Sequence, residues 1–309
     1  MPVASIVGAV FGAIFLALLI FWLVGERGRL LRSSSWKILR AGGLRNLLNL
    51  NLLHLYLYGR WTKQYLGYQK KTLLPKMRSA KKKPWADRTH FKVLTPGQAG
   101  SIVALETNIV LRNQEQVIPF RTARDIILNG PPEIAAYECG CRKSSPNPCR
   151  PSQVCLVVGQ PFVDFILEHH PKDSRRVGKD EALAIIEAEH KRGHVQTAWF
   201  KEICLERFYA ICNCCKCCCV GIQAVTRHGI PMAAGSGYVA RVNEADCQAC
   251  AVCEEACPFG AIRVEDRAVV DWEKCLGCGV CQGQCPNGAV KLARDEKKGL
   301  PMDIRLMAG

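Results

Sequence analysis

The 309-residue sequence lacks several motifs that would assign it to a common cofactor class. It has no C-x-x-C-H motif, which argues against covalently attached c-type haem. It also has no G-x-x-x-x-G-K-[ST] phosphate loop. Gly235–Ala240 imitates a dinucleotide fingerprint, but this segment precedes a predicted strand outside any βαβ unit, so we interpret it as a turn. We recognise no readout domain, which disfavours a sensor.

Acidic residues are scarce in one part of the chain. Residues 1–25 carry no charged side chain, and residues 26–92 carry 17 basic residues against Glu26 and Asp87. Residues 93–309 are balanced, with 25 basic and 25 acidic residues. The whole excess of +15 therefore follows the N-terminal apolar segment. This placement suits an anionic inner leaflet better than a nucleic acid, and we expect no nucleic-acid partner.

Within the uncharged stretch 1–25, Ile6–Val24 is an apolar run of 19 residues. As a helix it would be about 28 Å long, close to the thickness of a bilayer's hydrocarbon core. Met1–Ser5 lacks the positive region of a signal peptide. The run predicts a retained transmembrane anchor over residues 1–25, with a buried core helix as the alternative. The basic residues that follow predict a single-pass protein of the plasma (inner) membrane, with most of the chain cytoplasmic.

The next two segments differ in composition. Residues 26–92 form a basic juxtamembrane segment, in which 44–66 has the pattern of an amphipathic helix and 70–88 that of a mobile linker. The helix either lies on the inner leaflet or packs on the following domain. Residues 93–235 read as a cysteine-rich, mainly helical domain with helices over 118–129, 162–169, 180–192 and 198–211. With residues 236–309 as a further domain, the predicted fold class is α+β.

Cysteine is the abundant residue, with 19 copies that cluster instead of spreading. Six fall within residues 212–219, too close for disulfides among themselves. Clustered thiols indicate metal or iron–sulfur ligation, whereas the lone Cys204 suits a structural role. We expect one or two further iron–sulfur clusters in the middle domain; zinc, a dithiol redox site and inert thiols are the alternatives. The ten candidate ligands are Cys139, Cys141, Cys149, Cys155, Cys212, Cys214, Cys215, Cys217, Cys218 and Cys219.

Residues 247–290 contain a duplication. The run Cys247-x-x-Cys250-x-x-Cys253-x-x-x-Cys257-Pro258 recurs 28 residues later as Cys275-x-x-Cys278-x-x-Cys281-x-x-x-Cys285-Pro286. Three evenly spaced thiols can curl around one face of a cubane, and the fourth has to come from elsewhere. Zinc, which paired C-x-x-C motifs also bind, does not require this arrangement. The duplication resembles the bacterial dicluster ferredoxin domain, over about residues 236–294.

The resemblance implies two [4Fe–4S] clusters with crossed ligation, since in this family the fourth cysteine of each run ligates the other cluster. One cluster would take Cys247, Cys250, Cys253 and Cys285, and the other would take Cys275, Cys278, Cys281 and Cys257. The layout of the whole chain resembles a group of prokaryotic membrane-associated ferredoxin-type proteins with a CNCC-x-CCC run. That broader resemblance implies no firm activity.

These features together predict a membrane-anchored iron–sulfur electron-transfer protein. It would relay electrons between a redox partner or multisubunit redox complex and the membrane. An electron carrier fits better than a stand-alone enzyme. The alternative is an oxidoreductase whose active site is the cysteine-rich middle domain, supplied with electrons by the ferredoxin module.

Overall fold

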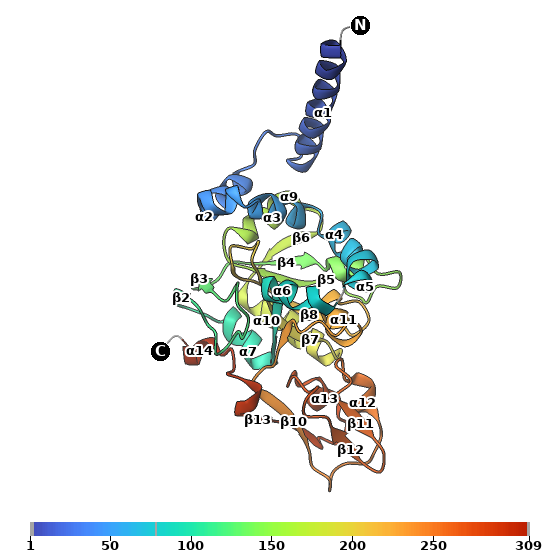
Figure 1. The fold of residues 1–309 in the computed structure, drawn as a ribbon. Coiled ribbons are helices and arrows are strands. Elements are labelled where there is room, and N and C mark those ends of the chain that lie inside the picture. The colour runs from blue at the N-terminus through green and yellow to red at the C-terminus, as the bar shows by residue number, and fades with distance from the viewer. Residues whose placement is uncertain (1–2, 78, 308–309) are drawn as a thin grey trace.

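The computed structural model describes residues 3–77 and 79–307. Residues 1–2, 78 and 308–309, which fall in the predicted anchor, basic segment and C-terminal domain, lie outside the described part. The chain forms three tiers (Figure 1): a projecting helix, a body built around a β-sheet, and a C-terminal module at the opposite end from the helix. The fold is mixed α+β, as the sequence predicts.

The projecting helix is α1 (Val3–Gly25). Its segment Val7–Gly25 has a mean hydropathy of 2.7 and is not buried against the protein, except at its last residue, Gly25. Within the described residues it is the one helix that is long and apolar enough to cross a membrane. By length and composition alone it fits either a membrane anchor or a signal sequence.

The C-terminal end of α1 packs into the body. Phe21 stacks on Trp61 with ring centroids 4.7 Å apart, and Trp22 stacks on Tyr56 at 5.0 Å. Directly after the helix, Glu26 is fully buried, where its carboxylate accepts a hydrogen bond from the Ser35 hydroxyl at 2.7 Å. A buried carboxylate needs such partners, so the end of α1 is part of the folded structure.

A series of helices follows, some of them covering the top of the body: α2 (Ser33–Leu48), α3 (Asn51–Arg60), α4 (Thr62–Tyr68), a π-helix (Gln69–Leu73), α5 (Leu74–Lys76) and α6 (Ser79–Arg88). The predicted helix over 44–66 is therefore broken, and Leu50 lies at the break with a left-handed φ of +61°. Leu52 and Leu55 are buried in one core with α9, whereas Leu44 and Leu48 are exposed. Of the two alternatives for the amphipathic segment, packing on the next domain holds for α3. The basic stretch 70–88 is largely helical where the structure describes it, not an irregular linker.

The body contains a seven-stranded sheet in the order β6-β4-β5-β8-β7-β1-β9. Its strands are β1 (Thr89–Leu94), β4 (Ile134–Glu138), β5 (Gln153–Val158), β6 (Ser174–Val177), β7 (Val195–Lys201), β8 (Arg207–Cys214) and β9 (Ala233–Ala234). Neighbouring strands pair antiparallel, except that β1 and β9 are parallel. The prediction of a mainly helical middle domain is therefore wrong.

The error has a physical cause in the hairpin β7–β8, which replaces the helix predicted over 198–211. Six of the seven residues of β7 are buried, because helices cover both faces of the sheet. A strand buried on both faces loses the alternation of polar and apolar residues that marks a half-exposed strand. The predicted helix over 118–129 is also wrong: Ile126–Leu128 is strand β3, paired with β2 (Ile109–Leu111).

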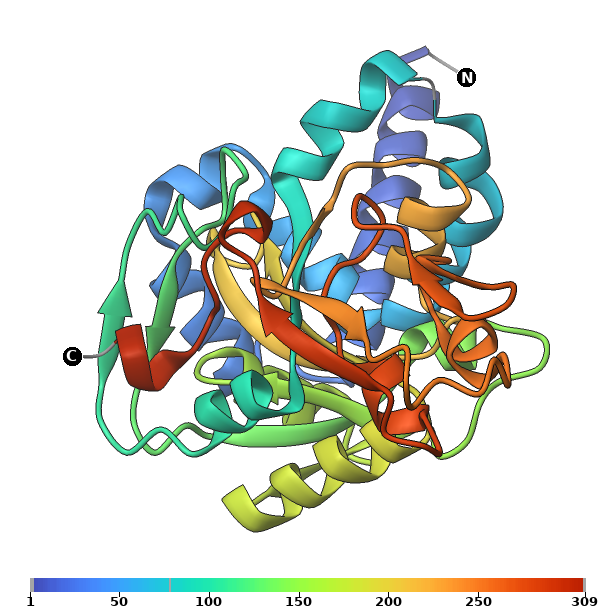
Figure 2. The same ribbon diagram turned by 90° about the horizontal axis from the view of Figure 1, so that it is seen from below.

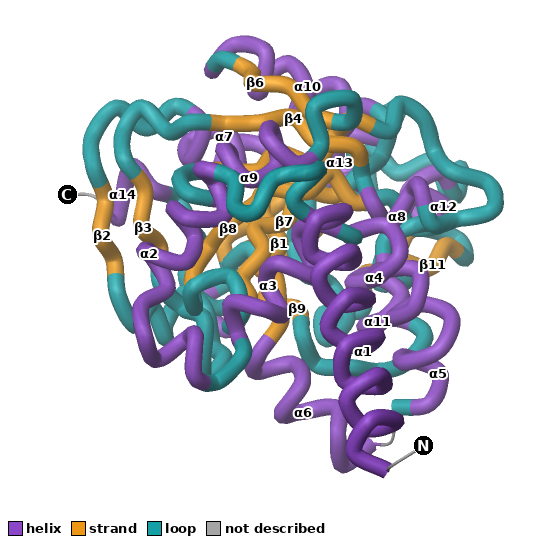
Figure 3. The backbone as a smooth tube through the Cα atoms, turned by 90° about the horizontal axis from the view of Figure 1, so that it is seen from above, coloured by secondary structure: helices purple, strands orange, loops and turns teal. Residues whose placement is uncertain are grey.

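Helices lie on both faces of the sheet (Figure 3). On one face, α7 (Pro96–Val103) and α10 (Lys179–Lys191) cover a core that includes Ile134 and Ala136. On the other, α9 (Phe162–His169) and α3 cover Ala135 and Tyr137. The helices predicted over 162–169 and 180–192 are confirmed by α9 and α10. Two short helices, α8 (Gly140–Lys143) and α11 (Val220–Thr226), follow cysteine-bearing turns.

The C-terminal module repeats one unit. It comprises β10 (Tyr238–Val242), α12 (Val252–Ala256), β11 (Ile262–Val264), β12 (Ala268–Val270), α13 (Val280–Gln284) and β13 (Val290–Arg294), with β10 antiparallel to β13 and β11 to β12. A 3₁₀ turn (Glu296–Lys298) and α14 (Ile304–Met307) return the chain to the body, where α14 contacts α7. Viewed from below, the module lies in front of the sheet (Figure 2). Gln284 Nε2 donates to the carbonyl of Lys191 at 2.9 Å, and Lys92 Nζ donates to that of Gly235 at 2.7 Å, so the module is docked.

Candidate iron–sulfur and metal sites

The C-terminal module holds two small cavities, each lined by four cysteines drawn from both repeats. One is lined by Cys247, Cys250, Cys253 and Cys285. The other is lined by Cys257, Cys275, Cys278 and Cys281. Three cysteines of each set lie in one loop, and the fourth comes from the other repeat. The structure thus brings together the two groups of residues that the ferredoxin resemblance implies, while their ligation stays a prediction.

The backbone of the two loops is shaped alike. Ala249 and Ala251 have left-handed φ values of +51° and +60°, and the equivalent Gly277 and Gly279 have +66° and +79°. At Gly277 a Cβ would lie 2.2 Å from the carbonyl oxygen of Tyr238, so a side chain there is excluded. Left-handed residues turn the loop tightly enough for its thiols to face one centre.

Backbone amides point at the sulfurs. The N–H of Ala261 lies 3.2 Å from Cys257 Sγ, and that of Ala240 lies 3.4 Å from Cys275 Sγ. Hydrogen bonds of this kind stabilise bound thiolates and help to set the reduction potential of a cluster. The cavities, loops and donors therefore fit a cubane in each position.

The two cavities differ in exposure. Cys250 is exposed at the first cavity, whereas all four thiols at the second are buried. Burial raises the pKa of the Cys281 thiol to about 12, so this group stays protonated at neutral pH unless a metal binds it. The second cavity lies on the side of the module that contacts the body, since a Cβ on its lining residue Gly279 would lie 3.7 Å from Cε1 of His190 in α10.

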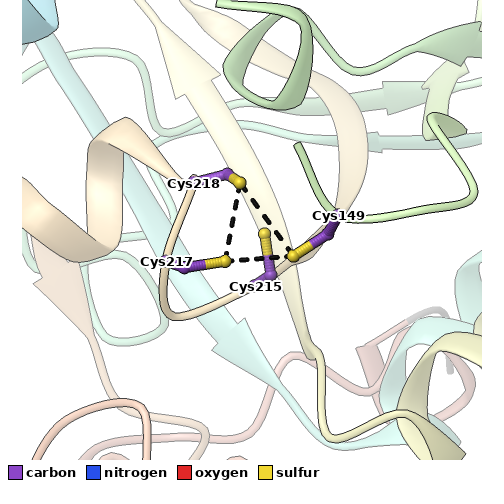
Figure 4. A group of neighbouring side chains, drawn as sticks. All are labelled: Cys149, Cys215, Cys217 and Cys218. Carbon is purple, nitrogen blue, oxygen red and sulfur yellow. Dashed lines mark hydrogen bonds between the residues drawn. The ribbon is translucent and has the colours of Figure 1, made fainter. Parts of the chain in front are cut away.

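A third group of cysteines gathers in the middle domain (Figure 4). Its members, which we call the quartet, are Cys149, Cys215, Cys217 and Cys218. Cys149 lies in the loop between α8 and β5, and the other three lie in the loop between β8 and α11. The sulfur of Cys149 is 3.0 Å from that of Cys217 and 4.0 Å from that of Cys218.

The spacing of the quartet fits a single metal ion. All four sulfurs lie within 4.8 Å of one another. A tetrahedral ion with metal–sulfur bonds of about 2.3 Å would separate its thiolates by about 3.8 Å. A cubane holds its ligands further apart, because iron and sulfide lie between them. Among the described residues, neither C-terminal set is gathered as tightly as the quartet. A mononuclear tetrathiolate site therefore fits best here.

The other six candidate cysteines form a separate group, which we call the ring: Cys139, Cys141, Cys155, Cys212, Cys214 and Cys219. They line one cavity on the face of the sheet that α9 covers. Cys204 is a further buried thiol on the wall of the same cavity, and burial raises its pKa to about 12. The ten residues that the sequence offers as one group are thus divided by the structure into four and six.

Sequence reasoning missed three charged residues beside these thiols. Arg142 and Glu189 form a fully buried ion pair, and Lys201 lines the cavity of the ring. The sequence offers a reason to place Arg142 near the thiols, because this residue directly follows the Cys139-Gly-Cys141 turn. It offers no reason to place Lys201 there, because the sequence pattern predicts a helix where Lys201 lies in a strand.

Comparison with known families supports the C-terminal sites. The family described as the 4Fe-4S binding domain matches residues 240–263 and 268–291, one match for each repeat. No curated protein matches the chain. The two motifs imply iron–sulfur electron transfer, and the quartet is a separate candidate metal site in the middle of the chain.

Proposed function

We propose that the chain is a membrane-anchored electron-transfer protein that relays electrons through two [4Fe–4S] clusters in its C-terminal module. The observation that carries this proposal is the pair of cavities, each lined by three cysteines of one 4Fe-4S motif and the crossing cysteine of the other. When bound, such clusters supply one-electron chemistry. The two motifs interlock, which keeps the two sites adjacent.

The chain itself holds and tunes the clusters. The eight cysteines provide the thiolates, and the left-handed loop residues aim them at common centres. Amides such as that of Ala261 favour the added negative charge of the reduced state. Apolar side chains, among them Val290 at the first cavity and Phe259 at the second, restrict the access of water.

The first cavity is more exposed than the second, which suggests that the two ends of the relay have different roles. The first cavity reaches the surface at Cys250, so a soluble redox partner would approach there. The second cavity adjoins the body, where further cysteines lie. Electrons would therefore pass between an exposed docking end and the interior of the protein.

The packing of α1 supports a retained anchor over a cleaved signal sequence. Cleavage near Gly25 would remove Phe21 and Trp22 from their stacks on Trp61 and Tyr56. Arg60 Nε also donates to the carbonyl of Gly25 at 2.8 Å. We propose that α1 spans the inner membrane, with the basic residues after it on the cytoplasmic side.

The quartet would serve as a structural metal site beside the relay. Lys216, within the quartet loop, donates from Nζ to the carbonyl of Glu255 in the C-terminal module at 3.1 Å. Closing that loop around an ion would fix this contact between the body and the module.

The test is anaerobic purification of the full chain in detergent, followed by iron and sulfide counting and EPR of the reduced protein. We expect at least about eight irons and eight sulfides per chain, with signals of two interacting [4Fe–4S] clusters. A C-terminal module that binds only zinc, or a colourless protein without labile sulfide, would overturn the proposal.

A further inference from the structure

The six thiols of the ring line one cavity. The sulfurs of Cys214 and Cys219 are in direct contact, 3.1 Å apart. Cys155 lies on β5, Cys212 and Cys214 on β8, Cys139 and Cys141 at the start of α8, and Cys219 directly before α11. Four separate segments of the chain thus deliver six thiols to one place.

The ring is not a set of disulfides. The sulfurs of Cys214 and Cys219 lie 3.1 Å apart, well beyond a bond of about 2.05 Å. All six cysteines are free thiols. They also differ from the quartet, because among the described residues no three of the six have sulfurs that all lie within 4.8 Å of one another. The ring is therefore wider than the ligand shell of one tetrahedral ion.

The six thiols line a cavity of about 110 Å³, and Cys204 and Cys215 also reach its wall. The rest of the wall is largely apolar and includes residues of α3, α4 and α9, such as Leu55, Leu66 and Phe165. Sulfurs that served only to fill a core would pack against carbon on all sides. These sulfurs instead share an enclosed space with one another.

An independent observation is the charge at the wall of this cavity. Lys201 lines it and is only 3% exposed. Its ammonium lies over the ring of Tyr58, whose centroid is 3.3 Å from Nζ. Burial disfavours the charged form of Lys201, and the thiols of Cys204, Cys141 and Cys212 favour it. A buried cation needs an anionic partner, so the cavity is suited to an anion.

We propose that the ring is a second kind of iron–sulfur site in this chain, separate from the quartet, in which thiolates of the six cysteines hold an anionic cluster facing Lys201. The cluster supplies the missing counter-charge, and six thiols exceed the four that a single cubane takes from protein. The site adjoins the relay, because Cys214 and Cys219 share one apolar core with Cys257 and Cys278 of the C-terminal module. The inference rests on the proposed iron–sulfur chemistry, yet its failure would leave the C-terminal clusters in place.

The first experiment compares two sets of variants in the anaerobically purified full chain. Cys155→Ala and Cys212→Ala change the ring, Cys217→Ser changes the quartet, and Cys204→Ala is the matched control for a buried thiol that lies on the same cavity wall but is not part of the ring. We expect each ring variant to lose about four or more irons per chain with the matching sulfide, while the EPR signals of the C-terminal clusters persist. The control should lose none, and Cys217→Ser should keep the irons that the ring variants lose.

Two outcomes would overturn the proposal: ring variants that keep the full iron content, or ring and quartet variants that remove the same signal. The C-terminal signals report whether a variant has folded. If the ring variants also lose the EPR signals of the C-terminal clusters, the variant Lys201→Met tests whether a cluster lies in the cavity. With a cluster beside it, loss of the cation lowers the reduction potential of one centre while iron content is kept; Lys191→Met, at an exposed position, is the control. Unchanged potentials of all centres in Lys201→Met would refute the site.

Discussion

Arg142 donates from Nη2 to Oε2 of Glu189 over 2.6 Å, with side-chain exposures of 0% and 1%. The same nitrogen donates to the carbonyl of Asn213 at 3.1 Å. The guanidinium therefore joins the turn of Cys139 and Cys141 to α10 and to the end of β8. Burial alone would raise the pKa of Glu189, but hydrogen bonds from His194 and Arg142 hold it below its usual value. The pair is ionised and positions both middle-domain cysteine groups.

Replacing Arg142 should destabilise the protein strongly. Arg142→Met leaves Glu189 buried without its main partner, and breaking a buried pair from one side costs about 3–5 kcal/mol. The measurement is the thermal or denaturant midpoint of the anaerobic protein. Arg192→Met is the matched control, because Arg192 also contacts Glu189, at 2.9 Å, from a more exposed position and should cost less than about 1 kcal/mol. Equal effects of the two variants would show that the buried pair has no special role.

Crossed ligation makes a specific prediction about which variants share a phenotype. Cys285→Ser should damage the same cluster as Cys250→Ser, although the two residues lie in different repeats. Cys257→Ser should damage the other cluster, together with Cys278→Ser. EPR and iron content, with a loss of up to about four irons in each case, provide the measurement. If Cys285→Ser instead resembled Cys278→Ser, ligation would stay within each repeat.

The quartet should hold one metal ion. X-ray absorption at the zinc edge of protein purified with zinc should show a single sulfur shell at about 2.3 Å. Cys217→Ser should release that ion, whereas Lys216→Ala, in the same loop, should keep it. Metal–metal scattering at the quartet would instead indicate a cluster.

His90 makes the protein sensitive to acid. It is fully buried and stacks on Phe120 with centroids 4.1 Å apart, and burial lowers its pKa to about 4. Below about pH 6.5, the ordinary pKa of histidine, His90 is protonated in the unfolded chain but stays neutral in the native state, so the free energy of unfolding falls as the pH falls. Between pH 7 and pH 5 the free energy of unfolding should decrease by about 2 kcal/mol through His90.

The measurement for His90 is the difference between two pH profiles of stability, one for the wild type and one for His90→Gln. Other histidines, such as the buried His169 and the half-buried His170, also have pKa values that burial lowers, and they contribute to both profiles. The profile of His90→Gln should be flatter over this range. Parallel profiles would exclude a role for His90.

The apolar helix should remain on the mature protein and hold it in the membrane. Mass spectrometry of protein extracted from membranes should find the peptide that contains Phe21 and Trp22. Removal of residues 1–20 should leave a soluble protein with its clusters, because the contacts of Phe21, Trp22 and Glu26 with the body are kept. An N-terminus that begins after Gly25 would identify a signal sequence instead.

The C-terminal sites could be predicted because their signal is local. Eight cysteines with fixed spacing lie within residues 247–285, so the ligand groups follow from a short repeat. The division of the middle cysteines could not be predicted, because it depends on long-range pairing. Cys149 meets Cys217, 68 residues away, only after β5 and β8 have joined in the sheet.

The sheet of the body does not follow from the sequence for a related reason. Strands buried on both faces carry no alternation of polar and apolar residues, so the pattern predicts a helix over 198–211, across parts of β7 and β8, and does not place Lys201 at the cavity. The helices α9 and α10 were predicted correctly, because each has a polar side that preserves the helical period. The sequence therefore predicts helices and strands that have one exposed side, and it predicts loops whose ligands are close together in the chain.

The run from Cys212 to Cys219 serves two centres at once. Cys212, Cys214 and Cys219 belong to the ring, whereas Cys215, Cys217 and Cys218 belong to the quartet. Inserting or deleting one residue in this stretch would exchange thiols between the two groups and disable both. Descendants of this chain can therefore vary the length of many surface loops, but we expect the length of this one to stay fixed.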